Sequence, residues 1–136
     1  MKSTVTPLRG RRVLLVEDNA INRAIARSFL ESAGCEVEDA YNGAQALDKL
    51  CAHVPDHFDL VLMDLQMPVM DGYEAARRIR ALHDPQLSAI SIVTMTANAL
   101  AQDLERERVC GVSRHLSKPI GLTALHAALC EVLREN

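Results

Sequence analysis

Four charged residues follow short apolar segments and could together act on a phosphoryl group. Glu17 and Asp18 follow one run, Asp64 follows a second, and Lys118 comes after a third. The first two runs are apolar at successive positions and rich in branched residues, which is typical of a strand buried on both faces of a parallel sheet. Because ligands of open α/β sheets bind at the carboxyl ends of the strands, we expect these charges to converge on one crevice.

The mixture of three acids and one lysine indicates what this crevice could bind. Carboxylates packed together repel one another unless a cation joins them, and hard oxygen ligands suit Mg²⁺. A lysine beside the acids adds a second positive charge, which an anion can share. The cluster therefore predicts a site that receives a phosphoryl group.

Length and composition are typical of one soluble globular domain, with 136 residues, 49% of them hydrophobic and 24% charged. A formal net charge of −3 and an aromatic content of 3% argue against a nucleic-acid binder. We expect no membrane contact, because no apolar run approaches a membrane span and the chain start lacks the core of a signal peptide. Cys35, Cys51, Cys110 and Cys130 form no CxxC pair, and we interpret them as buried thiols of a reduced cytoplasmic protein.

The apolar periodicity predicts five strands that alternate with five helices, which together form a doubly wound parallel sheet. The expected strands are residues 12–16, an edge strand around Val37, 59–63, 89–95 and 112–116. The first expected helix begins after a cap at Asn19, and a fifth helix closes the chain. The three helices between them are expected at 44–51, 72–82 and 98–109.

The sequence also predicts which side chains are buried, exposed or cap a helix. Ile21, Ile25 and Phe29 recur at helical spacing in the first helix. The closing helix is expected to bury a stripe formed by Leu122, Leu125, Leu129 and Val132. Asp71 is expected to cap the helix that begins near Gly72, and Asp84 followed by proline is expected to end it. Three arginines of that helix are interpreted as its solvated face: Arg77, Arg78 and Arg80.

The chain resembles the response-regulator receiver domain, the phosphoacceptor module of two-component signalling. The matching segments are VLLVEDN at 13–19, LVLMDLQMPVMDGYEA at 60–75, TANA at 96–99 and HLSKPI at 115–120. The sequences of these segments are most similar to those of receivers attached to hybrid sensor histidine kinases. The resemblance implies the flavodoxin-like strand order 2-1-3-4-5, a linker or lead-in at 1–10 and a receiver (response regulatory) domain at 11–136.

The resemblance implies a role for each charged residue of the cluster. Asp64 would be the phosphoacceptor, with self-phosphorylation and autodephosphorylation activity. Asp18, Asp64 and the backbone carbonyl of Gln66 would be direct ligands of Mg²⁺, for which Mn²⁺ could substitute. Glu17 would hold the metal through water, and Lys118 would contact the phosphoryl group.

Other matching positions would take part in the structural response to phosphorylation and in the approach of the donor histidine. The Thr96 hydroxyl would swing toward the phosphoryl group, and the small Ala97 would let the donor histidine approach. The family also has a cis peptide bond at Lys118–Pro119. One position departs from the pattern, since His115 stands where the family usually has Tyr or Phe, whose ring turns inward when the threonine moves. Histidine is polar and can ionise near neutral pH, so we expect this ring to turn inward less readily than Tyr or Phe.

The resulting prediction is a phosphorelay receiver that accepts a phosphoryl group from a phosphohistidine and passes on the signal or the phosphate. Its partners would be a sensor histidine kinase, a histidine phosphotransfer domain or both, docked on the first helix near Asn22, Ile25 and Ala26. We expect a monomer or weak dimer in the cytoplasm. The chain is either a free receiver or a segment of a hybrid kinase, and the motifs favour the segment. Such a kinase could itself be membrane-bound.

Three alternative functions fit the sequence less well. A Mg²⁺-dependent aspartyl-phosphate phosphohydrolase usually has a second aspartate two residues after the nucleophile, where this chain has Gln66. A flavin- or nucleotide-binding module would need a Gly-rich or Ser/Thr-rich loop after the first strand, but acids stand there. A degenerate receiver that serves only as an interaction module would lack one of the charged positions, and all are present.

Overall fold

The structure is a computed structural model that describes residues 8–53, 57–65, 67, 70–96 and 108–134. The strands are β1 (Arg12–Val16), β2 (Glu36–Ala40), β3 (Leu60–Asp64), β4 (Ser91–Thr96) and β5 (Arg114–Ser117). The helices are α1 (Ala20–Ser32), α2 (Gly43–Ala52), α3 (Gly72–Arg80), α4 (Pro85–Ser88) and α6 (Leu122–Arg134). All strands pair in parallel in the order β2-β1-β3-β4-β5. The predicted fold class and strand order are confirmed.

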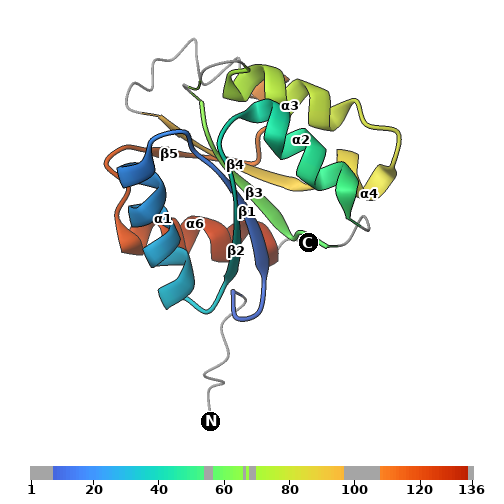
Figure 1. The fold of residues 1–136 in the computed structure, drawn as a ribbon. Coiled ribbons are helices and arrows are strands. Elements are labelled where there is room, and N and C mark those ends of the chain that lie inside the picture. The colour runs from blue at the N-terminus through green and yellow to red at the C-terminus, as the bar shows by residue number, and fades with distance from the viewer. Residues whose placement is uncertain (1–7, 54–56, 66, 68–69, 97–107, 135–136) are drawn as a thin grey trace.

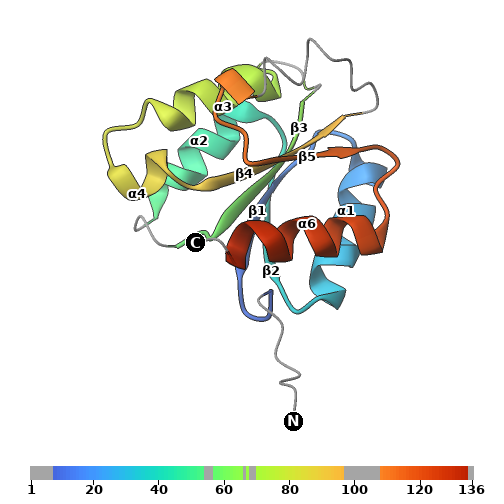
Figure 2. The ribbon, with the colours of Figure 1, turned by 180° about the vertical axis from the view of Figure 1, so that it is seen from behind.

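Helices cover both faces of the sheet. Figure 1 and, from behind, Figure 2 show α1 and α6 on one face and α2, α3 and α4 on the other. Val13 and Leu15 of β1 belong to the core cluster on the α1 and α6 side, whereas Leu14 and Val16 belong to the opposite cluster. Because successive strand residues point to opposite faces, a strand covered on both sides needs an apolar residue at every position. This is why continuous apolar runs indicated the central strands.

Polar caps and a glycine set the limits of the helices. The Asn19 side chain accepts a backbone hydrogen bond in the first turn of α1, and Gly34 follows the end of this helix with φ of 94°. Asp71 caps α3 in the same way, as predicted. Helix α3 ends at Arg80, earlier than predicted, and the side chain of Asp84 instead caps the short helix α4, which the sequence pattern did not predict. Each cap satisfies backbone N–H groups that a helix start leaves without partners.

Three side chains lie elsewhere than predicted. Leu122 is 46% exposed, because it is the first residue of α6 and precedes the turns that pack on the sheet. Cys51 is exposed in the last turn of α2 and is not a buried thiol. Arg80 is not part of the solvated face of α3, since its guanidinium is half-buried against three backbone carbonyls.

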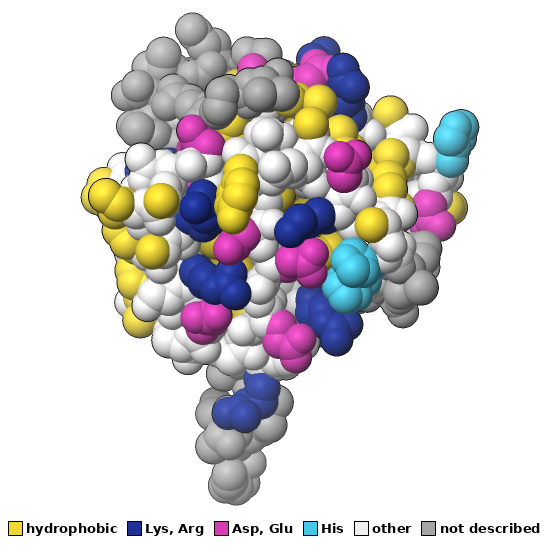
Figure 3. All heavy atoms as spheres, in the orientation of Figure 1, with side chains coloured by type: hydrophobic (Ala, Val, Ile, Leu, Met, Phe, Trp, Pro, Cys, Tyr) yellow, Lys and Arg dark blue, Asp and Glu magenta, His cyan; other side chains and the backbone are white. Residues whose placement is uncertain are grey.

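Helix α1 has an exposed apolar surface. Ile21 and Ile25 are 71% and 45% exposed, whereas Ala26 and Leu30 are the buried residues of the helix. Figure 3 shows hydrophobic side chains gathered on the side of the molecule where α1 lies. The apolar residues of α1 therefore form two surfaces, one in the core and one in contact with solvent.

The described part of the chain begins inside the predicted lead-in, and Leu8 is fully buried in the core on the α1 side. The helix expected at 98–109 falls almost entirely outside the described residues, which resume at 108. Among the helices that the structure describes, none has the length and apolar character of a membrane-spanning segment.

Candidate functional site

The predicted site residues lie at the carboxyl ends of four strands. Glu17 and Asp18 follow β1, Asp64 and Thr96 are the last residues of β3 and β4, and Lys118 follows β5. Because parallel strands end at the same edge of the sheet, residues far apart in sequence come together here.

The distances between the charged groups are short. The Lys118 ammonium lies 3.1 Å from Oε1 of Glu17 and 3.2 Å from Oδ2 of Asp64. Carboxylate oxygens of Glu17, Asp18 and Asp64 all lie within 4.8 Å of one another. The Glu17 and Asp64 residues are buried, and Asp18 is exposed at the mouth of the site. The structure thus brings together the four charged residues that the sequence pattern singled out.

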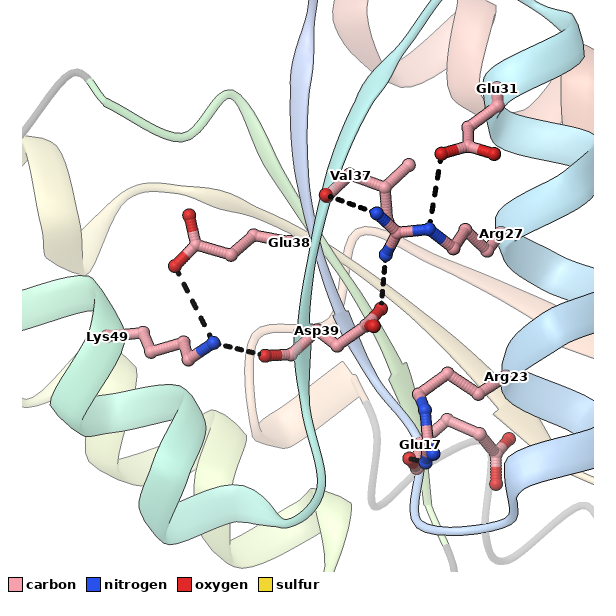
Figure 4. Close-up of polar contacts among 8 residues, drawn as sticks. All are labelled: Glu17, Arg23, Arg27, Glu31, Val37, Glu38, Asp39 and Lys49. Carbon is pink, nitrogen blue, oxygen red and sulfur yellow. Dashed lines mark hydrogen bonds and ion pairs between the residues drawn. The ribbon is translucent and has the colours of Figure 1, made fainter.

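Backbone hydrogen bonds hold the turn that carries the two adjacent acids. The N–H of Glu17 donates to the carbonyl of Ala40, and its Oε2 accepts a hydrogen bond from the N–H of Asn19. Arg23 donates to the carbonyl of Glu17 at 2.9 Å (Figure 4). It also donates to the carbonyl of Asp18 at 3.3 Å. Arg23 was not predicted as a site residue, because its spacing from the acids resembles that of any arginine in the first turns of a helix.

Close backbone packing fixes the other half of the site. A Cβ at Gly72 would lie 2.8 Å from both the carbonyl oxygen of Asp64 and the Cα of Leu65, so only glycine fits beside the end of β3. On the other side, the N–H of Lys118 donates to the carbonyl of Thr96, and the Lys118–Pro119 peptide bond is cis. The lysine is therefore tied to the end of β4 before its side chain reaches the acids.

The charges of the site shift the pKa values of two of its groups. Burial, and then the charge of Asp64, raise the pKa of Glu17, although hydrogen bonds from Asn19 and Lys118 act in the opposite direction. Burial alone would lower the pKa of Lys118, but its hydrogen bond to Glu17 and the charge of Asp64 outweigh burial and raise it. The raised pKa of Glu17 is typical of a buried carboxyl beside a like charge, whereas the raised pKa of Lys118 is typical of an ammonium held by carboxylates.

The chemistry of the donor set fits a hard divalent cation. Glu17, Asp18 and Asp64 offer only carboxylate oxygens, which Mg²⁺ prefers over nitrogen or sulfur. Three carboxylates and one ammonium leave these four side chains with a net negative charge that a cation would offset. The raised pKa of Glu17 has the same origin, since it reflects the cost of concentrating negative charge in a buried place.

The residues expected to serve switching and access are only partly described. Thr96 is 2% exposed at the end of β4. His115 of β5 pairs in register with Thr94, and its Nδ1 lies 3.3 Å from the Thr94 hydroxyl. The contact with Thr94 was not predicted, because it depends on the register of two strands. Gln66 and Ala97 lie outside the described residues.

A cavity of about 380 Å³ lies beside the charged cluster. Its lining joins the cluster to α1 and to the segment after β5, and consists of Glu17, Asn22, Ile25, Lys118, Pro119 and Ile120. Ile21, whose side chain is exposed, directly precedes the lining residue Asn22 in the sequence. The cavity gives the buried acids an open, apolar approach along α1.

Comparisons with known proteins agree with this arrangement. The sequence matches the response regulator receiver domain family over residues 13–130. A two-component response regulator of Oryza sativa subsp. japonica is 42% identical over 123 residues, which cover 88% of this chain and 92% of that protein. Probable histidine kinase 2 of Oryza sativa subsp. indica is 38% identical over 125 residues, which cover 84% of this chain but only 12% of the kinase. The chain thus spans a small part of the kinases it resembles.

Two solved structures are similar in fold and sequence. The receiver domain of a sensor histidine kinase from Pseudomonas aeruginosa has a TM-score of 0.82 and 34% identity, covering 92% of this chain and 98% of that one. That structure is described with a magnesium ion coordinated in its active site cleft. The receiver domain of a Saccharomyces cerevisiae response regulator, in complex with a histidine phosphotransfer signaling protein, has a TM-score of 0.78 and 32% identity, covering 91% and 89%.

Proposed function

This chain belongs to the response regulator receiver domain family of two-component signalling, and we propose that it accepts a phosphoryl group from a phosphohistidine onto Asp64 in a Mg²⁺-dependent reaction. It then passes on the signal or the phosphate. The observation that carries the proposal is the Lys118 ammonium between the Glu17 and Asp64 carboxylates at the strand ends. A lysine and a cluster of acids in one crevice suit an anion that arrives together with a cation.

The reaction is a nucleophilic displacement at phosphorus. A carboxylate oxygen of Asp64 forms the new P–O bond, the P–N bond of the donor breaks, and its electron pair stays on the donor imidazole. Lys118 beside Asp64 balances part of the negative charge that the phosphoryl group brings. Asp18, Asp64 and the carbonyl of Gln66 are the proposed direct ligands of the cation, and Glu17 would hold it through water. A bound Mg²⁺, or Mn²⁺ in its place, would neutralise charge that develops on the phosphoryl oxygens.

The donor is a sensor histidine kinase or a histidine phosphotransfer domain. The exposed Ile21 and Ile25 and the cavity along α1 support this assignment, because they offer an apolar surface directly beside the acids. The interface is expected to be small and transient, since the partners must separate after transfer. The similarity to hybrid signal transduction histidine kinases favours a receiver that works as one segment of such a kinase. We propose the cytoplasm as its location.

Incubation with acetyl phosphate and Mg²⁺, followed by intact-protein mass spectrometry, tests the proposed acceptor. The wild type should gain one phosphoryl group, and Asp64→Asn should gain none. Asp71→Asn is the matched control, because Asp71 caps α3 and should leave phosphorylation unchanged. Phosphate on another residue of the Asp64→Asn variant at wild-type stoichiometry would contradict the assignment.

The same assay separates the receiver from the alternative, a phosphohydrolase that forms an aspartyl phosphate. A phosphohydrolase would release inorganic phosphate over many turnovers, whereas a receiver should hold about one phosphoryl group per chain and turn over slowly. Rapid release of inorganic phosphate over many turnovers would favour the phosphohydrolase.

Docking of the donor can be tested at α1. Ile25→Ser should slow transfer from a phosphohistidine donor while leaving phosphorylation by acetyl phosphate unchanged, because the small donor does not need the apolar patch. Leu122→Ser is the control, since Leu122 is similarly exposed but starts α6. Equal effects of Ile25→Ser on both donors would remove α1 from the docking surface.

A further inference from the structure

Two histidines and a glutamate converge on the edge strand β2, apart from the acids and lysine described above. Glu38 lies in the middle of β2, His53 is the residue that ends α2, and His57 precedes β3. Figure 4 shows Glu38 directed toward α2, whereas Glu17 lies at the end of β1 beside α1. Histidine side chains lie among acidic and basic side chains on this face of the molecule (Figure 3).

Both imidazoles direct a nitrogen at the same carboxylate. Nε2 of His53 lies 3.7 Å from Oε2 of Glu38, and Nε2 of His57 lies 3.8 Å from Oε1. The two rings stack with their centroids 3.8 Å apart, and Phe58 packs edge-on against both. One ligand atom from each of the three residues lies within 4.8 Å of the other two.

The stacked pair is more than a surface ion pair. A neutral imidazole is the form that binds metals. A weak ion pair to Glu38 requires one histidine at most, and it leaves the convergence of the second on the same carboxylate unexplained.

The spacing is close to that of a tetrahedral site. Ligand atoms bound to Zn²⁺ at about 2.0–2.1 Å lie about 3.3 Å from one another. The observed distances of 3.7 and 3.8 Å from Glu38 need only small side-chain movements to reach this value. One imidazole must also rotate out of the stack, because two parallel rings cannot both point their lone pairs at one ion. All three side chains keep 22–37% of their surface exposed, so water can supply a fourth ligand.

We propose that Glu38, His53 and His57 form a second metal site, which binds a late first-row divalent cation, with Zn²⁺ as the first candidate. Imidazole nitrogen selects such ions over Mg²⁺, whereas the all-carboxylate cluster at the strand ends has the opposite preference. The bound ion links the end of α2, the edge strand and the segment that enters β3. Zn²⁺ therefore stabilises the folded chain, because it binds a site that the unfolded chain lacks.

Lys49 is the group that competes with the ion. Its ammonium lies 3.6 Å from Oε2 of Glu38 and also donates to the carbonyl of Asp39 (Figure 4). When Glu38 turns to the metal, the lysine keeps its bond to the carbonyl. Removing the lysine charge should then tighten metal binding, so Lys49→Met is a variant with an effect opposite in sign to that of ligand removal.

The test is a calorimetric titration of the metal-free protein, without a polyhistidine tag, with Zn²⁺ in excess Mg²⁺, which occupies the acid cluster. The wild type should bind one equivalent of Zn²⁺. His53→Gln, His57→Gln and Glu38→Gln should each weaken binding by more than about tenfold. His83→Gln is the matched control, because His83 is exposed and lies outside the cluster. Asp18→Asn, which alters only the acid cluster, should leave Zn²⁺ binding unchanged.

A second readout guards against variants that lose their fold. Zn²⁺ should raise the melting temperature of the wild type and of His83→Gln, but not that of His53→Gln, whose exposed position makes misfolding the least concern. No Zn²⁺ binding by the wild type would overturn the proposal. Binding that survives all three ligand substitutions, or that disappears with Asp18→Asn, would overturn it as well.

Discussion

The ammonium group of Lys118 lies 3.1 Å from Oε1 of Glu17, although 101 residues separate them in the chain. The strands that precede them, β5 and β1, are not neighbours, since β3 and β4 lie between them in the sheet. The lysine therefore reaches across the ends of two strands and also contacts Asp64 on the way. This contact joins the two halves of the doubly wound fold at the place where the acids meet.

Removing the lysine should destabilise the protein most when no divalent cation is present. Lys118→Met leaves the buried Glu17 without its ammonium partner, and we expect the free energy of unfolding to fall by about 1–3 kcal/mol. Mg²⁺ should restore part of this loss, because it replaces the missing positive charge. Urea denaturation with and without Mg²⁺ measures both effects. Lys49→Met, at a more exposed lysine, should cost about 1 kcal/mol or less. Equal losses in the two variants would contradict a special role for Lys118.

Gly72→Ala should disturb the acceptor through the backbone. The new Cβ meets the carbonyl oxygen of Asp64 and the Cα of Leu65 at 2.8 Å, and neither can move without shifting the end of β3. We expect a loss of about 1–3 kcal/mol in stability and slower phosphorylation by acetyl phosphate. Gly121→Ala is the control, since nothing lies within 4 Å of its added Cβ. Wild-type phosphorylation rates in Gly72→Ala would show that the acceptor tolerates this shift.

Arg80 should stabilise the chain through hydrogen bonds to backbone carbonyls. Its guanidinium donates to the carbonyls of Gly111, Ser88 and Ile90, and thereby ties α3 to the segments on either side of β4. Burial lowers the pKa of Arg80, but an arginine stays charged at neutral pH. Arg80→Met should lower the free energy of unfolding by about 1.5–3 kcal/mol.

The neighbouring arginine provides the comparison for Arg80. Arg78 is exposed and pairs with Glu74 within the same helix, so Arg78→Met should change stability by about 0.5 kcal/mol or less. Thermal and urea unfolding of the two variants should rank them clearly. A loss for Arg78→Met as large as that for Arg80→Met would mean that the carbonyl contacts contribute little.

His115 should limit the structural response to phosphorylation. Its imidazole contacts the Thr94 hydroxyl, and a polar ring enters an apolar slot less readily than Tyr or Phe does. We expect beryllofluoride with Mg²⁺ to cause larger NMR shifts around β4 and β5 in His115→Tyr than in the wild type. His83→Tyr, at an exposed position, should behave like the wild type. Identical shifts in all three proteins would remove His115 from the switch.

The cysteines should differ sharply in reactivity. Burial raises the pKa of the Cys35 thiol to about 11, so at neutral pH it stays protonated and the reactive thiolate is scarce. Cys51 is exposed on α2 and should be alkylated first by iodoacetamide. Raising the pH toward 11 should favour the thiolate of Cys35, although burial still limits access. Peptide mass spectrometry after brief labelling at pH 7 checks the order, and prior labelling of Cys35 would contradict it.

The amino-acid sequence by itself determined the strands of the sheet, the caps at Asn19 and Asp71, and the charged residues at the strand ends. These features depend on short-range rules. A continuous apolar run is needed wherever both faces of a strand are covered, a polar cap satisfies the N–H groups that follow it, and parallel strands deliver their next residues to one edge. Each rule can be applied with a few neighbouring residues in view.

Tertiary structure alone decided the features that depend on distant partners. Helical spacing gives the period of an apolar stripe but not which face the sheet will cover, so Ile25 is exposed while Ala26 is buried. Arg80 resembles a solvated arginine until folding places three backbone carbonyls around it. In the same way, His53 and His57 are scattered histidines in the sequence, and the packing of α2 against β2 aims both at one carboxylate. Such contacts join segments whose relative position no local pattern encodes.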